Sequence, residues 1–264
     1  MTHAAESTHW YRASDGSPAY TVRMANGKER NTTLADARKS SLVPSVTTIL
    51  KCQDKPALTT WMIDQAIYAA LTLPRREGEM EADWIKRVKQ DAKEHGRQAA
   101  ETGTAIHAAI QGHYEGQPPP EEFWPHVKAA TKAITEAYGN QVWIPEASFA
   151  HPLGFGGKCD LSCNSGPGIV CDFKGKDFTV EEMDGLKTWD EHAQQLAAYR
   201  VGLGLPHASC GIVYVSRNVP GLAKFISVPQ DELDRGYRMF TALLDYWKAK
   251  SKFDPSFSDM PEAA

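Results

Sequence analysis

The stretch from Gly154 to Lys174, GFGGKCDLSCNSGPGIVCDFK, constrains the fold of this chain more than any other. Its central residues, Asn164 to Gly168, supply the positive and fixed φ angles that a chain reversal needs. We therefore predict two short antiparallel strands joined by this turn. Because residues two apart in a strand share a face, Asp172 and Lys174 are expected to point the same way, opposite to Cys171.

Asp160 lies near the middle of the first predicted strand. If the hairpin register brings Asp160 alongside Asp172, two carboxylates and the ammonium of Lys174 converge. Two carboxylates without a counter-ion repel each other, and one would stay protonated. A divalent cation removes that conflict, and such an oxygen-rich site suits magnesium or manganese.

The composition is that of an ordinary globular protein, and 264 residues allow one large domain or two small ones. No apolar run is long enough to span a bilayer and the N-terminus has no apolar signal core, so we expect a soluble intracellular protein without membrane partners. The chain has five cysteines, an odd number, and they lie beside predicted buried strands. Both observations favour reduced thiols over a disulfide framework. A net charge of −4 argues against a protein that coats nucleic acid non-specifically, but it allows an enzyme with a local basic groove.

The remaining elements follow from hydrophobic spacing and from capping and turn residues. We predict helices over residues 45–50, 56–73, 82–114, 123–138, 191–202 and 230–250, and strands over residues 141–151, 211–216 and 223–228. The long helix is expected to be interrupted near Gly96 and Gly103. One side of the helix over residues 56–73, including Trp61, is expected to be buried. This order fits a largely buried sheet with helices on both faces.

Four short motifs, in order along the chain, resemble those of the PD-(D/E)XK nucleases, specifically the RecB-like exonuclease branch. They are G-T-x-x-H at residues 103–107, G-x-x-D at 157–160, D-x-K at 172–174 and Q-x-x-x-Y at 195–199. Residues 44–47, PSVT, are similar to an N-terminal element of the mitochondrial genome maintenance exonuclease and phage relatives. Each motif alone is weak, whereas four in the right order and on suitable elements are specific.

The resemblance implies an α/β fold, with a restriction-endonuclease-like central mixed sheet flanked by helices and a mainly helical N-terminal extension. We expect the extension over residues 1–90 and the nuclease core over residues 91–264. The proline of the family name is absent, as is common in this branch. Gly175 stands where threonine is common, which puts a minor contact in doubt.

The resemblance also implies a role for each motif residue. Asp160 and Asp172 would bind the metal, together with the Phe173 backbone carbonyl oxygen and the imidazole of His107. Lys174 would hold or deprotonate the attacking water, with its pKa lowered by the charge of the metal.

Three further residues have supporting or open roles. Gln195 and Tyr199, one helical turn apart, would orient Lys174 or a DNA phosphate. Glu146 could support the other ligands, bind a second metal or simply face water.

Weaker candidates for DNA contacts are Ser45, Thr47, Lys158 and Lys176. Ser45 and Thr47 can instead serve only to cap a helix, and a solvated face is the default for the lysines. Trp61, Trp84 and Trp124 could stack on bases, although helical spacing makes the core the better interpretation for Trp61. Surface or structural roles are the default for the histidines other than His107, which include His113, His126, His151 and His192.

Some relatives carry an iron–sulfur cluster on four cysteines, three of them after the Q-x-x-x-Y helix. Here Cys159, Cys163 and Cys171 lie inside the hairpin, and strand parity turns Cys159 and Cys171 away from the neighbouring aspartates. We therefore predict Mg²⁺ or Mn²⁺ as the cofactor and no iron–sulfur cluster.

Three functions stay open at this stage. The first is a metal-dependent DNA exonuclease that acts at DNA ends in recombination, repair or replication. The second is a structure-specific or defence-related endonuclease on the same fold, and the third is a non-catalytic DNA-binding protein. The implied partners are DNA that is single-stranded or has free ends and a single-strand annealing or binding protein, in the cytoplasm of a bacterial or phage-infected cell.

Overall fold

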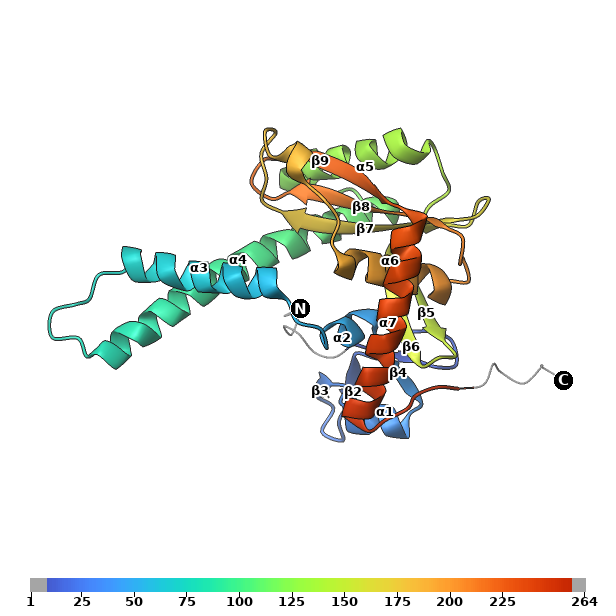
Figure 1. Cartoon of the computed structure of the whole chain (residues 1–264), viewed down its shortest axis with the longest axis horizontal. Coiled ribbons are helices and arrows are strands. Elements are labelled where there is room, and N and C mark those ends of the chain that lie inside the picture. Colours follow the sequence, from blue (N-terminus) through green and yellow to red (C-terminus); the bar gives the residue numbers. More distant parts are fainter. Residues whose placement is uncertain (1–8, 258–264) are drawn as a thin grey trace.

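A five-stranded mixed sheet forms the centre of the computed structural model, which describes residues 9–257 (Figure 1). The strands lie in chain order: β5 (Ile144–His151), β6 (Phe155–Cys163), β7 (Ile169–Lys176), β8 (Ser209–Ser216) and β9 (Ala223–Val228). β7 and β8 are parallel, and the other neighbours are antiparallel. The parallel pair requires a crossover, which contains a short 3₁₀ turn (η2, Met183–Gly185) and helix α6 (Asp190–Gly202). The predicted hairpin of β6 and β7 is confirmed.

Helices cover both faces of this sheet, so the mixed α/β class expected from the sequence is confirmed. One face carries α4 (Glu81–Tyr114) and α5 (Trp124–Tyr138), which follows the 3₁₀ turn η1 (Glu121–Phe123). The other face carries α6 and α7 (Gln230–Ser251). Alternation along β8 sends Ile212 and Tyr214 toward α6 and α7 and sends Val213 toward α4 and α5.

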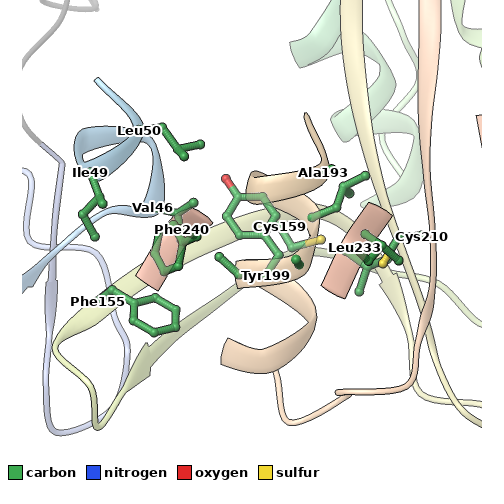
Figure 2. Packing of buried hydrophobic residues seen from close by; sticks show 14 of the residues in the cluster. Val46, Ile49, Leu50, Phe155, Cys159, Ala193, Tyr199, Cys210, Leu233 and Phe240 are labelled. Carbon is green, nitrogen blue, oxygen red and sulfur yellow. The ribbon is translucent and has the colours of Figure 1, made fainter. Parts of the chain in front are cut away.

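Residues 9–50 are tied to the α6 and α7 side of the sheet. They form a β1 (Trp10–Arg12) and β4 (Leu42–Pro44) pair, a hairpin of β2 (Thr21–Arg23) and β3 (Glu29–Asn31), and the helices α1 (Leu34–Lys39) and α2 (Val46–Leu50). Figure 2 shows the α2 side chains in the same buried cluster as Phe155 of β6 and Phe240 of α7. Close packing of α7 on α6 depends on Gly236, where an added Cβ would lie 2.7 Å from the Ala193 carbonyl carbon.

Helix α3 (Pro56–Thr72) and the first half of α4 form an antiparallel arm that projects from the body of the molecule (Figure 1). The expectation that one side of α3 is buried is wrong, since Ala69 is its one buried residue among those whose side chains are described. Trp61 is 41% exposed because α3 packs against α4 in the arm, away from the sheet.

The expected breaks in the long helix are also wrong, because α4 is continuous from Glu81 to Tyr114. At Gly96 the missing side chain leaves room for the Trp61 indole, to which an added Cβ would come within 3.4 Å. The division into residues 1–90 and 91–264 stays a prediction, and α4 crosses that boundary as one helix. Among the described residues, none of the helices has the length and apolar character that crossing a membrane requires.

Candidate active site

Asp160 lies at a point where β6 changes the face that its side chains present. Before it, Cys159 packs into the cluster beneath α6 and α7; after it, Leu161 packs into the cluster beneath α4 and α5. Regular β6–β7 pairing ends at Leu161 and Cys171, and beyond that pair the Asp160 carboxylate accepts a hydrogen bond from the Phe173 backbone N–H at 2.8 Å. The Asp160 carboxylate therefore satisfies a backbone N–H of β7 at the point where β6 and β7 separate.

Asp172, Lys174, Gln195 and Tyr199 form a hydrogen-bonded network on the α6 side of the sheet. The first three contact one another, and Tyr199 contacts Gln195. The Lys174 ammonium lies 2.7 Å from Asp172 Oδ2 and donates to Gln195 Oε1 at 3.0 Å. Gln195 Nε2 lies 2.9 Å from Asp172 Oδ1 and 3.0 Å from Tyr199 Oη. Gln195 thus fixes Asp172 and Lys174 together, while Tyr199 holds Gln195 from one turn further along α6. The structure brings all four residues together; strand parity predicted the proximity of Asp172 and Lys174, and helical spacing predicted that of Gln195 and Tyr199.

His107 reaches Asp160 from the opposite face of the sheet. It lies on α4, and its Nε2 is 3.0 Å from Asp160 Oδ2. Asp160 therefore joins α4 to β7, the strand that carries Asp172 and Lys174.

Glu146 completes a three-residue cluster with His107 and Asp160. One ligand atom from each of these side chains lies within 4.8 Å of the other two. Glu146 and Asp160 fall between the β5–β6 pairs Pro145–Leu161 and Ala147–Cys159, so they stand opposite each other in the register. Glu146 has a φ of 55°, a left-handed conformation that is unfavourable for a residue with a side chain and is retained mainly at functional sites.

This donor set fits a hard divalent cation, since it contains two carboxylates and one imidazole. The Glu146 carboxylate forms an ion pair with the Lys158 ammonium. Lys158 was expected to contact DNA; here it neutralises a member of the cluster. Asp172 lies outside the three-residue cluster and inside the Lys174 and Gln195 network.

The two aspartates have opposite electrostatic environments. Burial, together with the nearby charge of Asp160, raises the pKa of Asp172 to about 6. Burial alone would raise the pKa of Asp160 too, but the His107 imidazole holds that pKa below its usual value. Of the two aspartates, Asp160 is the one that stays ionised more easily. A bound cation would favour ionisation of Asp172 as well.

The Lys174 ammonium is held in its charged form. Burial alone would lower the pKa of Lys174, but the carboxylates of Asp172 and Asp160 raise it above the usual value. The sequence analysis expected a lowered pKa for Lys174 because of the charge of a bound metal. The raised pKa therefore describes the metal-free site, and the lowered pKa is expected for the metal-bound site. Burial alone would likewise lower the pKa of His107, but the Asp160 carboxylate raises it above the usual value.

The other residues expected to contact DNA lie near the site with their polar groups engaged. Ser45 is buried, caps α2 by accepting from the Thr48 N–H, and lies 3.0 Å from the Thr47 hydroxyl. The Lys176 ammonium lies 6.0 Å from the centre of the Tyr214 ring. Contacts of these residues with DNA stay predictions, as does a metal contact of the Phe173 carbonyl oxygen.

The buried Cys159 and Cys171 belong to clusters on opposite faces of the sheet, and the absence of an iron–sulfur cluster also stays a prediction.

His192 is the residue near the site to which the sequence analysis gave no role beyond a structural default. Its Nδ1 accepts from the Trp189 N–H at 3.2 Å and lies 3.3 Å from Tyr214 Oη. Burial, and next the charge of Lys174, lower the pKa of His192 to about 4, which keeps the imidazole neutral. The sequence contained a signal for this placement, because His192, Gln195 and Tyr199 are spaced to share one face of a helix.

Comparison with known proteins gives no match to a family model and no match among curated proteins. Among solved structures, the crystal structure of SSO0001 aligns over 73% of this chain and 91% of its own, with 13% identity and a TM-score of 0.26. An alkaline exonuclease from Laribacter hongkongensis, LHK-Exo, aligns over 74% of this chain and 98% of its own, with 15% identity and a TM-score of 0.27. Its complex with dAMP gives 14% identity, 71% and 91% coverage and a TM-score of 0.25. TM-scores this low establish neither a shared fold nor a shared activity.

Proposed function

We propose that this protein is a metal-dependent nuclease that hydrolyses phosphodiester bonds at DNA ends. The observation that carries the proposal is that the Asp172–Lys174 ion pair flanks Phe173, whose backbone N–H donates to the Asp160 carboxylate where β6 and β7 separate. Phosphodiester hydrolysis needs an activated water and positive charge near the phosphate, and this arrangement can provide both. The four motifs support the assignment to the RecB-like branch of the PD-(D/E)XK nucleases and to its restriction-endonuclease-like fold.

Mg²⁺ or Mn²⁺ is the proposed cofactor, held by Asp160, His107 and Asp172 with Glu146 as a further ligand. When bound, the ion supplies positive charge that polarises the phosphate and lowers the pKa of coordinated water. The His107, Glu146 and Asp160 cluster supports the metal proposal because its donor atoms are close together and of the right chemical type. The sequence-based role of Asp172 in the same site stays part of the proposal.

Lys174 has two roles in this proposal. As an ammonium it stabilises negative charge that develops on the phosphate oxygens, and it holds the attacking water by a hydrogen bond. It can take a proton from that water only after its pKa has fallen, because the metal-free site keeps it protonated. Gln195 keeps the Lys174 Nζ in place throughout, since its carboxamide oxygen accepts from Nζ while its nitrogen contacts Asp172.

The deciding experiment is digestion of end-labelled linear DNA by the full chain with Mg²⁺, Mn²⁺ or EDTA. We expect cleavage with either metal, none with EDTA, and a rate about 10²–10⁴-fold lower in Lys174→Ala. Lys132→Ala is the matched control, because the Lys132 side chain is 75% exposed on α5, and it should keep full activity.

Closed circular DNA separates the alternatives. An exonuclease leaves it intact, whereas nicking would indicate an endonuclease. Absence of cleavage in all metals would leave the non-catalytic DNA-binding function. A single-strand annealing or binding protein as a partner and action in recombination, repair or replication are parts of the proposal that rest on the family resemblance.

A further inference from the structure

A cleft of about 730 Å³ lies between the start of α3, the segment before α6 and the first turns of α6. Its wall includes the side chains of Lys55, Lys187, Trp189, His192 and Gln194. None of these residues belongs to the proposed catalytic set, so the role of the cleft is a separate question.

Trp189 provides a half-exposed aromatic ring on a fixed backbone. Its side chain is 51% exposed, with the Lys187 ammonium 5.0 Å from its ring centre. The backbone on either side is anchored: the Trp189 N–H donates to His192 Nδ1, and the Lys187 carbonyl oxygen accepts from Tyr214 Oη at 3.0 Å. An exposed indole held in this way can stack on another ring without a large ordering cost.

The cleft adjoins the catalytic centre through α6. His192 lines the cleft and is near enough to Lys174 for that charge to affect its protonation. Glu191, also in the cleft wall, is paired with Lys55 at 2.6 Å and acts electrostatically on Lys174. Gln194 in the cleft wall is followed along α6 by Gln195, whose Oε1 accepts from Lys174 Nζ at 3.0 Å, so one helix contacts both the cleft and the residue that is proposed to act on the scissile phosphate.

The inner wall of the cleft carries an unsatisfied amide. Gln194 is only 2% exposed; its Nε2 donates to Gln53 Oε1 at 3.0 Å, whereas its Oε1 has no hydrogen-bond partner in the described part of the chain. A buried acceptor without a partner costs free energy that a ligand with a donor can recover. The charged side chains of the cleft wall are largely paired, Glu191 with Lys55 and Asp190 with Arg235, which suits an uncharged ring.

We propose that this cleft binds an unpaired nucleobase of single-stranded DNA, stacked on Trp189 and hydrogen-bonded to the Gln53–Gln194 amides. The inference rests on the proposed nuclease function and specifies the strand form that the site accepts. A base inside a duplex has both faces covered by its neighbours and cannot stack on an indole, whereas a single-stranded base can. Lys187, beside the indole, is placed to meet the adjoining backbone phosphate.

The test compares two tryptophans in matched surroundings. Trp124 is 40% exposed with the Lys128 ammonium 5.1 Å from its ring centre, but it lies at the start of α5 and lines a different cavity. Binding of a fluorescein-labelled oligothymidylate to the full chain is measured by anisotropy with Ca²⁺ in place of Mg²⁺, for wild type, Trp189→Ala, Trp189→Phe and Trp124→Ala. Thermal unfolding of each variant verifies that it folds.

We expect Trp189→Ala to weaken binding by at least about fivefold, and Trp189→Phe to recover most of that loss. Trp124→Ala should bind as wild type does. In oligonucleotides with one abasic position, wild type should be sensitive at one position near the cleaved bond, and Trp189→Ala should lose that sensitivity. Binding of a blunt duplex should be the same in wild type and Trp189→Ala.

The outcomes distinguish the two proposals. If wild type cleaves DNA and Trp189→Ala binds the oligonucleotide as tightly as wild type, the base-binding cleft is wrong and the nuclease function stands. An equal loss in Trp189→Ala and Trp124→Ala would also overturn the cleft. If wild type neither binds nor cleaves DNA with any metal, the nuclease function is wrong and the cleft proposal fails with it.

Discussion

The Asp160 carboxylate accepts the backbone N–H of Phe173 at 2.8 Å, at a position where two neighbouring strands would ordinarily bond through their backbones. One carboxylate oxygen of Asp160 thereby closes the gap between β6 and β7 and also lies 3.0 Å from His107 Nε2. A side chain that is part of the sheet hydrogen bonding cannot move far, so the position of Asp160 is set by the backbone.

Glu146→Gln should weaken metal binding while the fold is kept. The substitution retains size and removes a charged oxygen ligand, so we expect at least a tenfold rise in the Kd for Mn²⁺ (about 1.4 kcal/mol). Calorimetric titration of the full chain measures this Kd directly, and the metal-dependent rise in Tm should shrink in parallel. Glu136→Gln, exposed on α5, is the control and should match wild type. Equal Mn²⁺ affinity in Glu146→Gln and wild type would remove Glu146 from the metal site.

Lys158→Met should have the opposite effect on metal affinity. In the metal-free site the Lys158 ammonium is paired with Glu146 and competes with a cation for that carboxylate. The side chain of Lys158 is 35% exposed, which limits the pair to about 0.5–1 kcal/mol, so the Kd for Mn²⁺ should fall about two- to fivefold. The same titration measures it, with Lys132→Met as the control. Weaker Mn²⁺ binding in Lys158→Met would show that Lys158 supports the metal site.

His192 should make the fold sensitive to acid. Burial and the ammonium groups of Lys174, Lys176 and Lys55 keep the folded-state pKa near 4, against 6.5 for an unperturbed imidazole. Between these two values the unfolded chain binds a proton that the folded chain does not, so stability is present above about pH 6.5 and is lost as the pH falls toward 4. Full burial would make this about 3 kcal/mol, and partial exposure reduces it to about 1–2 kcal/mol.

Urea unfolding of wild type and His192→Asn at pH 7 and pH 5 measures this contribution. Asparagine can retain the hydrogen bond to the Trp189 N–H through its side-chain oxygen but does not titrate. The loss of stability between the two pH values should therefore be smaller in His192→Asn. The same loss in both proteins would rule out His192 as its source.

Gly202→Ala should destabilise the fold and impair the site, although alanine favours helices. An added Cβ would overlap the Phe149 ring, whose centre lies 6.0 Å from that of Tyr199. Overpacking of this kind costs about 1–3 kcal/mol, and the displaced ring should shift Tyr199 and, through it, Gln195. Gly112→Ala on α4 is the matched control, since its nearest contacts are at 3.7 Å to the Gln117 side chain, and it should gain up to about 1 kcal/mol. Thermal unfolding and DNA cleavage are measured for both, and equal stability of the two variants would contradict the packing argument.

Much of the architecture could be predicted because local signals agree with it. The turn over residues 164–168 joins β6 to β7, and strand parity places Asp172 and Lys174 on one face, where they form an ion pair. Gln195 and Tyr199 meet because i and i+4 residues share a helix face. Each of these relationships depends on spacing within one element or one hairpin.

The sequence could not predict features that depend on neighbours distant in the chain. Periodicity would keep Cys159 and Leu161 on one face, yet the strand changes face at Asp160, where it interacts with His107 on α4. The left-handed conformation of Glu146 likewise has no signal in its residue type. The apolar spacing of α3 indicated a buried side, but whether an apolar helix is covered depends on what folds against it.

The parallel arrangement of β7 and β8 has a consequence for how the protein acquires its site during synthesis. Lys174 and Gln195 come into contact through a crossover that begins on β7 and is completed only when β8, Ser209–Ser216, pairs beside it. A nascent chain that ends at Gly202 contains every residue of the proposed catalytic set but lacks the strand that holds α6 over β7. We therefore expect nascent chains that end before β8 to be inactive, and activity to appear only after the last quarter of the chain has been translated.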